Sequence, residues 1–176
     1  MNKQNICIIG GGITGLITAI SLSKLSFNID LVSNKKKSQL HKTIRTSAIS
    51  QNNYDFLKKL NIFKFSKKNF WPCSEIKLYA KTKKEKITEI LNWNKNKNSQ
   101  EKVFYMVNNN NLFKECLKYI KKNKLIKFKI NKSNFLKHIK MRENSNSKYN
   151  LHINCSGNNS NLPKTINGSE YFKYSY

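Results

Sequence analysis

The chain has few of the residues that define several common protein classes. Its four cysteines form no C-x-x-C pair within 176 residues and its three histidines stand alone, so neither a disulfide scaffold nor a zinc ribbon is expected. No run of roughly 18 apolar residues occurs, which argues against a membrane-spanning helix. However, 38% hydrophobic and 11% aromatic residues are enough for the core of one ordinary domain.

Acidic residues are also scarce. The chain has nine acidic and 34 basic residues, and its net charge is therefore +25. Such an excess of positive charge is typical of many nucleic-acid-binding proteins. The only arginines are Arg45 and Arg142, although readers of bases and phosphates depend on the guanidinium group. The lysines are scattered from Lys3 to Lys173, which favours compositional drift on a solvated surface and no specific nucleic-acid partner. A surface for anionic lipid and a polyanion-binding function remain as alternatives.

The first 25 residues raise the question of a secretion signal, because Lys3 precedes an apolar stretch over residues 6–20. Four glycines interrupt this stretch, and no convincing cleavage site follows it. The sparse, unpaired cysteines fit a reducing compartment. We therefore expect a cytoplasmic protein, with peripheral association at the inner membrane face left open.

Glycine is rare in the chain but concentrated in one place. Four of the six glycines lie at positions 10–15, in the pattern Gly10-x-Gly12-x-x-Gly15, directly after the apolar run 5–9. Helical spacing follows up to Leu25, and strand character returns at 28–32, so the sequence predicts a βαβ unit with a glycine turn. Such turns let a diphosphate approach the amides at a helix N-terminus, which predicts dinucleotide binding.

The second strand of a dinucleotide-binding unit usually ends in an acidic residue that binds the ribose hydroxyls. Here the expected position holds Ser33, and Asp30 lies three residues earlier, inside the strand. A serine can make one hydrogen bond but no charged bidentate contact. We therefore expect weaker nucleotide binding than in an intact site.

The rest of the chain predicts further strands and helices. A helix is expected from Ser47, and a break in the chain is expected at Trp71-Pro72. A second helix, capped by asparagine, is expected to have its apolar face on residues 112–120. Buried or alternating strands are expected at 74–80, 86–92, 104–107, 125–130, 134–140 and 149–155. Polar loops are expected at 34–44 and 94–102, and the signal fades after Pro163.

Four segments, taken in order, resemble the FAD-dependent aromatic hydroxylases of ubiquinone biosynthesis, which are similar to para-hydroxybenzoate hydroxylase. The first is Ile-Ile-Gly-Gly-Gly-Ile-Thr-Gly-Leu, and the second is Arg-Thr-Ser-Ala-Ile-Ser followed by Leu-Lys-Lys-Leu-Asn-Ile. The third is Tyr-Met-Val before a helix, and the fourth is the strand and turn ending in Cys-Ser-Gly-Asn-Asn-Ser. These segments occupy 8–16, 45–62, 105–117 and 149–160.

The resemblance implies an α/β fold of Rossmann type with a parallel sheet, in an incomplete FAD-binding domain at 1–72 and 103–160. Residues 73–102 and 161–176 would be partial strands of a small β-rich substrate domain. The implied cofactor is FAD, with NAD(P)H as reductant, and the implied substrate is a lipophilic, polyprenylated phenol. Arg45 would pair with pyrophosphate oxygens. The expected cofactor-binding residues are Gly10, Gly12, Thr14, Gly15, Ser33, Arg45 and Gly157.

The chain also departs from the family pattern. Ser33 and Ser156 stand where acidic residues are expected, and Asn110 stands at a position that is often arginine. The resemblance covers only the N-terminal portion of a monooxygenase, so a truncated chain is expected. No catalytic acid, base or nucleophile can be assigned, and no metal site is expected. The alternative is a degenerate, non-catalytic nucleotide-binding protein of the same fold.

Overall fold

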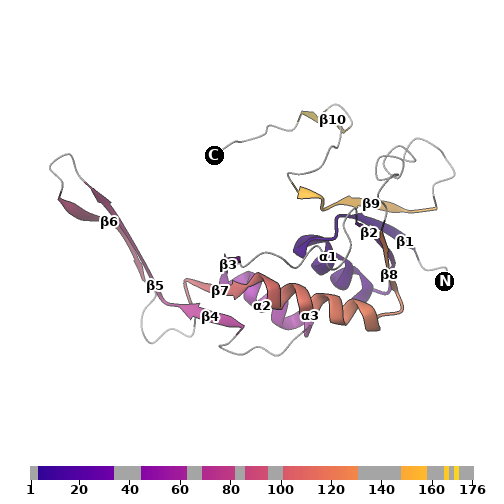
Figure 1. Ribbon diagram of the computed structural model, residues 1–176, viewed down its shortest axis with the longest axis horizontal. Helices are drawn as coiled ribbons and strands as arrows, with labels where there is room; N and C mark the ends of the chain where they lie inside the picture. The colour runs from indigo at the N-terminus through magenta and orange to yellow at the C-terminus, as the bar shows by residue number, and fades with distance from the viewer. Residues whose placement is uncertain are drawn as a thin grey trace.

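A parallel sheet of four strands forms one half of the fold. The computed structural model describes residues 4–33, 45–62, 69–81, 86–94, 101–130 and 148–157, together with strands at 165–166 and 169–170. In the sheet, β1 (Asn5–Ile9) lies between β2 (Asn28–Ser33) and β9 (Leu151–Asn154), and β8 (Ile126–Ile130) pairs with β2. All three pairings are parallel, so the carboxyl ends of these strands share one edge (Figure 1).

Two helices cover one face of this sheet. Helix α1 (Ile13–Lys24) connects β1 to β2, and α3 (Asn109–Lys122) leads into β8. Both helices contact β8 and each other, which places them on the same face of the sheet. The apolar face expected on α3 is buried.

An antiparallel sheet of three strands forms the other half. It has the order β3 (Thr46–Ile49), β7 (Phe104–Asn108), β4 (Phe70–Cys73). Helix α2 (Gln51–Leu60) packs on it through Tyr54, whose ring stacks on Tyr105 at 3.8 Å between centroids. One continuous core joins Leu57 and Val107 of this half to Ile8 of the parallel sheet.

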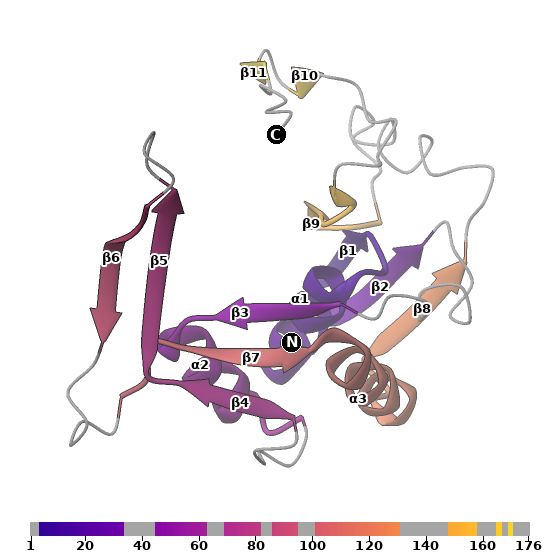
Figure 2. The same cartoon turned by 60° about the vertical axis from the view of Figure 1, so that its left-hand side comes forward.

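The expected hairpin is present as β5 (Glu75–Lys81) and β6 (Ile87–Asn94), which pair only with each other among the described strands. Figures 1 and 2 both show it extending away from the two sheets. A second antiparallel pair consists of β10 (Thr165–Ile166) and β11 (Ser169–Glu170). None of the described helices has the length and apolar character needed to cross a bilayer.

The helix expected from Ser47 begins four residues later than predicted. Residues 46–49 form β3 and pair with β7, and the helix begins at Gln51 after Ser50, whose side chain accepts a hydrogen bond from the Asn53 amide. Ile49 therefore belongs to the strand. Backbone pairing with a segment far along the chain outweighs the helical spacing of the apolar residues.

The break expected at Trp71-Pro72 is also wrong, because both residues lie within β4. This strand pairs only with β7 and forms an edge of its sheet. A proline, which lacks an N–H group, is tolerated on an edge strand. Trp71 is 67% exposed, so the aromatic residue is not a core residue here.

The strand expected over 149–155 is shorter and less buried than predicted. It spans Leu151–Asn154 as β9, and Leu151 is 48% exposed because β9 is the edge of the parallel sheet. Cys7 is fully buried as expected, but Cys155 is only partly buried. The strand expected at 134–140 and the loop at 34–44 lie outside the described residues.

Candidate functional site

The glycine turn after β1 is closely packed at two of its positions. Gly10 has a φ of +123°, and a Cβ there would overlap with the carbonyl oxygen of Cys155. At Gly15, a Cβ would overlap with the carbonyl oxygen of Gly10. Both positions therefore require glycine, since any side chain would separate α1 from β1 or β1 from β9.

Gly12, by contrast, faces open space. A Cβ at this position would have no atom within 4 Å, and Gly12 is the N-cap residue of α1 without a side-chain cap. The first ladder bond runs from the Leu16 amide to the Gly12 carbonyl at 3.0 Å, so the amides before Leu16 lie outside the helical ladder. Thr14 is exposed in this first turn, which holds no acidic residue. These amides and the helix dipole can together bind an anion.

Ser33 ends β2 and lies beneath the glycine turn. It is 2% exposed, and a Cβ added at Gly11 would be 2.6 Å from its hydroxyl oxygen. Phe128 of β8 borders the same position at 3.4 Å. The small side chain of Ser33 therefore lets Gly11 lie close to the sheet. A hydrogen bond between Ser33 and a ribose stays a prediction.

Gly157 lies at the same edge of the sheet, just beyond β9. Its φ is +68°, it is exposed, and a Cβ there would meet no atom within 4 Å. The preceding Ser156 donates from its amide and its hydroxyl to the Asn154 side-chain oxygen, at 3.1 and 2.6 Å. These bonds shape the turn that resembles the second flavin motif.

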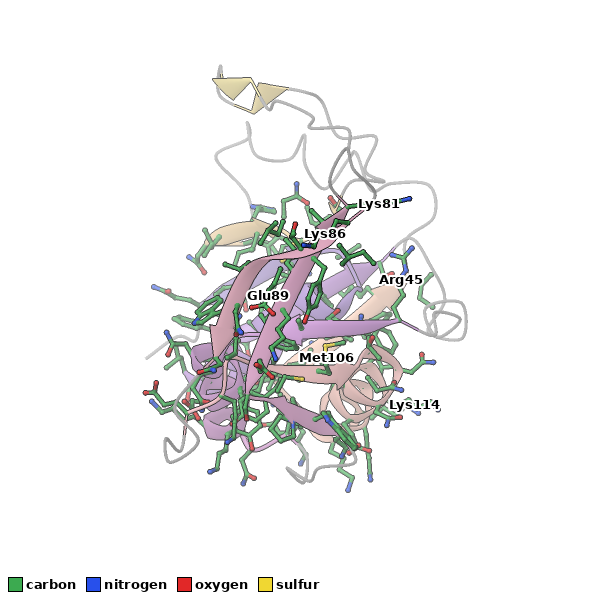
Figure 3. The ribbon with its side chains drawn as sticks, turned by 90° about the vertical axis from the view of Figure 1, so that its left-hand side faces the viewer. Arg45, Lys81, Lys86, Glu89, Met106 and Lys114 are labelled. Atoms are coloured by element: carbon green, nitrogen blue, oxygen red, sulfur yellow. The ribbon has the colours of Figure 1, made fainter. Side chains whose placement is uncertain are left out.

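Arg45 lies in the other half of the fold. It directly precedes β3, it is exposed, and its carbonyl accepts a hydrogen bond from the Asn109 amide at 3.1 Å. Figure 3 shows it beside the β3 ribbon, with Lys81 and Lys86 at the tip of the hairpin. The parallel sheet thus brings six of the seven expected residues to one edge, whereas Arg45 comes from the antiparallel sheet.

Sequence reasoning missed the part that the β9 backbone plays in the turn. The Cys155 carbonyl packs against Gly10, and the Cys155 amide donates to Ile9 at 2.7 Å. Burial raises the pKa of the Cys155 thiol, and a hydrogen bond with Thr18 opposes this only in part. The thiol therefore stays protonated at neutral pH. The glycine at position 10 is a hint in the sequence that a close approach occurs there, but it does not indicate the partner.

Comparisons with known proteins place the fold. No family model matches the chain, and no similar protein was found among curated sequences. Among solved structures, it is similar to PqsL, a probable FAD-dependent monooxygenase from Pseudomonas aeruginosa, with a TM-score of 0.57 and 11% identity over 73% of this chain and 33% of that one. It is also similar to the p-nitrophenol 4-monooxygenase PnpA from Pseudomonas putida DLL-E4, with a TM-score of 0.57 and 14% identity over 73% and 32%.

A third similar structure is the tetrameric form of 2-methyl-3-hydroxypyridine-5-carboxylic acid oxygenase, with a TM-score of 0.55 and 13% identity over 73% and 32% of the two chains. The match thus covers about a third of the length of each of these solved chains. At such low identity the likeness concerns the fold. The described part of this chain therefore shares its α/β fold with part of these solved chains.

Proposed function

We propose that this chain supplies the site for the ADP half of FAD in an FAD-dependent monooxygenase. The observation that carries the proposal is the uncapped N-terminus of α1, which opens at Gly12 between two glycines that admit no side chain. The residues present fit a diphosphate, because amides and a helix dipole face it and no side chain obstructs it. The fold shared with solved monooxygenases supports the same assignment.

Each residue of the edge would then have a defined part in binding. The amides at Ile13, Thr14 and Gly15 would donate to the diphosphate, and the exposed Thr14 hydroxyl could add one hydrogen bond. Gly157 would leave room beside β9 for the cofactor. Arg45 would supply a fixed positive charge from the other sheet. FAD itself, once bound, would supply the oxygen chemistry, and the protein would orient it and exclude water.

The substrate class belongs to the same proposal. A polyprenylated phenol of ubiquinone biosynthesis, with NAD(P)H as reductant, follows from the family resemblance. The solved relatives are consistent with a small aromatic substrate, since PqsL has been crystallised with 2-aminobenzoylacetate and PnpA is a p-nitrophenol monooxygenase. Residues 1–72 and 103–160 would form the FAD-binding domain. Residues 73–102 and 161–176 would belong to the substrate domain. A cytoplasmic location with peripheral membrane contact would suit a lipophilic substrate.

Substitutions at Gly12 test the proposal, because its open surroundings separate binding from folding. Gly12→Glu should place a carboxylate in front of the free amides and weaken ADP and FAD binding by about tenfold or more. The neutral Gly12→Gln is the matched control for bulk, and it should retain more of the affinity. Titration calorimetry measures both. Equal ADP affinity in the wild type and Gly12→Glu would refute a diphosphate site at this turn.

The alternative is a nucleotide-binding protein without oxidative chemistry. Ser33 and Ser156 favour it, because neither position offers a carboxylate to a ribose or to the flavin side. Purification distinguishes the two functions. Flavin that co-purifies and is bleached by NADH or NADPH supports the monooxygenase, whereas a colourless, folded protein that binds ADP supports the alternative.

A further inference from the structure

A polar pocket lies at the opposite end of the parallel sheet from the glycine turn. It has a volume of about 340 Å³ and extends from the beginnings of β1 and β2 to Asp30 in β2 and Lys129 in β8, with the segment before β9 on its other side. It shares no lining residue with the glycine turn, with Ser33 or with Gly157. The pocket is therefore distinct from the proposed FAD site.

Positive charge dominates this pocket. Four lysines but only one carboxylate, that of Asp30, line the pocket. The lysines are Lys124, Lys127, Lys129 and Lys148. Lys129 donates to Asp30 at 2.6 Å, and Lys148 lies 3.4 Å from the same oxygen. Lys124 and Lys127 have no ion-pair partner in the described segments. The lining thus keeps an excess of three positive charges after Asp30 is neutralised.

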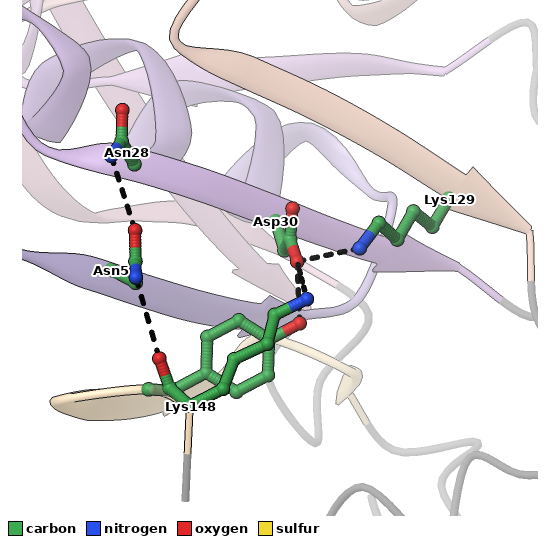
Figure 4. A network of polar contacts seen from close by, with 6 residues as sticks. Asn5, Asn28, Asp30, Lys129 and Lys148 are labelled. Atoms are coloured by element: carbon green, nitrogen blue, oxygen red, sulfur yellow. Dashed lines mark hydrogen bonds and ion pairs between the residues drawn. The ribbon is translucent and has the colours of Figure 1, made fainter.

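Hydrogen bonds and an ion pair fix the side of the pocket that carries Asp30, Tyr149 and Lys148. The Tyr149 hydroxyl donates to Asp30 at 2.5 Å, and Asn5 joins β1 to the carbonyl of Lys148 and to the side chain of Asn28 (Figure 4). The Asn5 amide also donates to Asn150 at 2.9 Å. A ligand would meet this side of the pocket preformed and would not have to order it.

The chemistry of the pocket fits binding and does not fit proton transfer. Burial would raise the pKa of Asp30, but hydrogen bonds from Lys129 and Tyr149 and the two lysine charges lower it below its usual range. Burial and the Asp30 contact raise the pKa of Tyr149 well above its usual range. Both groups therefore keep one protonation state near neutral pH and act as fixed parts of the wall.

We propose that this pocket binds a phosphomonoester dianion, held by Lys124, Lys127 and Lys148. Ammonium groups bind phosphate as point charges, and a dianion would offset two of the three excess positive charges. The volume falls in the range of small-molecule sites and exceeds that of a bare ion, which favours an organic phosphate. The site does not depend on the proposed FAD function.

The test is calorimetry on the full chain with ribose 5-phosphate as probe, in 0.15 M NaCl to screen long-range attraction. We expect saturable binding at one site. Lys124→Gln with Lys127→Gln should weaken it by about tenfold or more. The matched control is Lys58→Gln with Lys59→Gln on α2, which removes the same two charges from exposed positions elsewhere and should leave binding unchanged.

Vesicles containing phosphatidic acid form a second arm, because a lipid headgroup offers the same dianion. Loss of vesicle binding in the pocket variant alone, with no binding of ribose 5-phosphate, would assign the site to a lipid. Equal weakening by the control pair, or no saturable binding of either probe, would overturn the proposal. Gly12→Glu should leave ribose 5-phosphate binding intact, which separates this test from that of the FAD site.

Discussion

Asp30 occupies the middle of β2, between the buried Ile29 and Leu31. At 8% exposure it is the only charged residue buried among those described, and it tolerates this because Lys129, Lys148 and Tyr149 surround its carboxylate. Its position three residues before the strand end matches its predicted place inside the strand. Its side chain lies beside Cys7 on the face of the sheet opposite the two helices. Burial and, to a lesser degree, the negative charge of Asp30 raise the pKa of the Cys7 thiol to about 11.

Replacing Asp30 with asparagine should destabilise the fold. Asp30→Asn removes charge-assisted hydrogen bonds, which contribute about 1.5–3 kcal/mol each to stability. The folded pKa lies below the ordinary value of 3.8, so the contribution is present above pH 3.8 and is lost as pH falls through the folded pKa. Urea unfolding at several pH values should show a difference between wild type and variant that is constant near neutrality and shrinks below about pH 4. A pH-independent difference would contradict this account.

The glycine turn allows a comparison between two neighbouring alanine substitutions. Gly15→Ala should cost about 3 kcal/mol or more, because its Cβ would overlap with the Gly10 carbonyl between helix and strand. Gly12→Ala should cost less than about 1 kcal/mol, because its φ of −75° suits alanine and its Cβ has open space. Thermal unfolding of both variants measures the contrast, and similar losses at the two positions would refute the packing described.

The site could be predicted in part at this scale. The glycine spacing indicated both the turn and its place before α1, because few other patterns require four glycines in six residues. The sequence could not indicate that the Cys155 carbonyl packs against Gly10, since that contact joins residues 145 positions apart. The polar pocket was equally hidden, because its lysines are indistinguishable in sequence from the many lysines on the surface.

Among the elements, helices α2 and α3 are fixed at their starts by side-chain caps. The Asn108 side chain accepts from the Asn111 amide at 3.1 Å, and Ser50 accepts from the Asn53 amide at 3.3 Å. Helix α1 has no such cap, although it is the most buried of the three. The uncapped helix is thus the one whose N-terminus faces the candidate site.

Removing a cap should destabilise α3. Asn108→Ala leaves a helix amide without its partner and should cost about 1 kcal/mol of unfolding free energy. Asn110→Ala, two residues later inside the same helix, is the control and should be neutral or slightly stabilising because alanine favours helices. Chemical denaturation of the two variants provides the measurement. Equal destabilisation would mean that the Asn108 side chain does not act as a cap.

Elements with strong periodicity were predicted well, and those that depend on pairing were not. The βαβ unit, α3 and the hairpin follow from local patterns of apolar residues and turns. Residues 46–49 form a strand only because β7 lies beside them, and Trp71-Pro72 is accommodated because β4 has an unpaired side. Neither partner can be read from the residues nearby, so local reasoning placed a helix and a break there.

At the scale of the whole molecule, the two sheets share one core but the hairpin does not join it. Every residue of β6 is exposed, including Ile87 at 70% and Trp93 at 53%. An isolated two-stranded hairpin is only marginally stable in water. The hairpin is therefore less stable than the two sheets that share the core.

Hydrogen exchange should reveal this difference in stability. Amides of β6 are expected to exchange at least about a hundredfold faster than those of β1 and β2, which open only with the core. Exchange measured by mass spectrometry on peptides covering 87–94 and 5–9 tests this directly. Comparable protection in both peptides would mean that another surface covers the hairpin in solution.

The contact between Gly10 and Cys155 also has a consequence for the order in which the molecule is assembled. During synthesis the first strand, helix and second strand leave the ribosome early, yet the support for their connecting turn arrives only after residue 155 has been added. A nascent chain that stops short of this residue would carry the glycines without the backbone against which they rest. The proposed diphosphate site is thus complete only once residue 155 has been added, although the glycines of the turn are synthesised first.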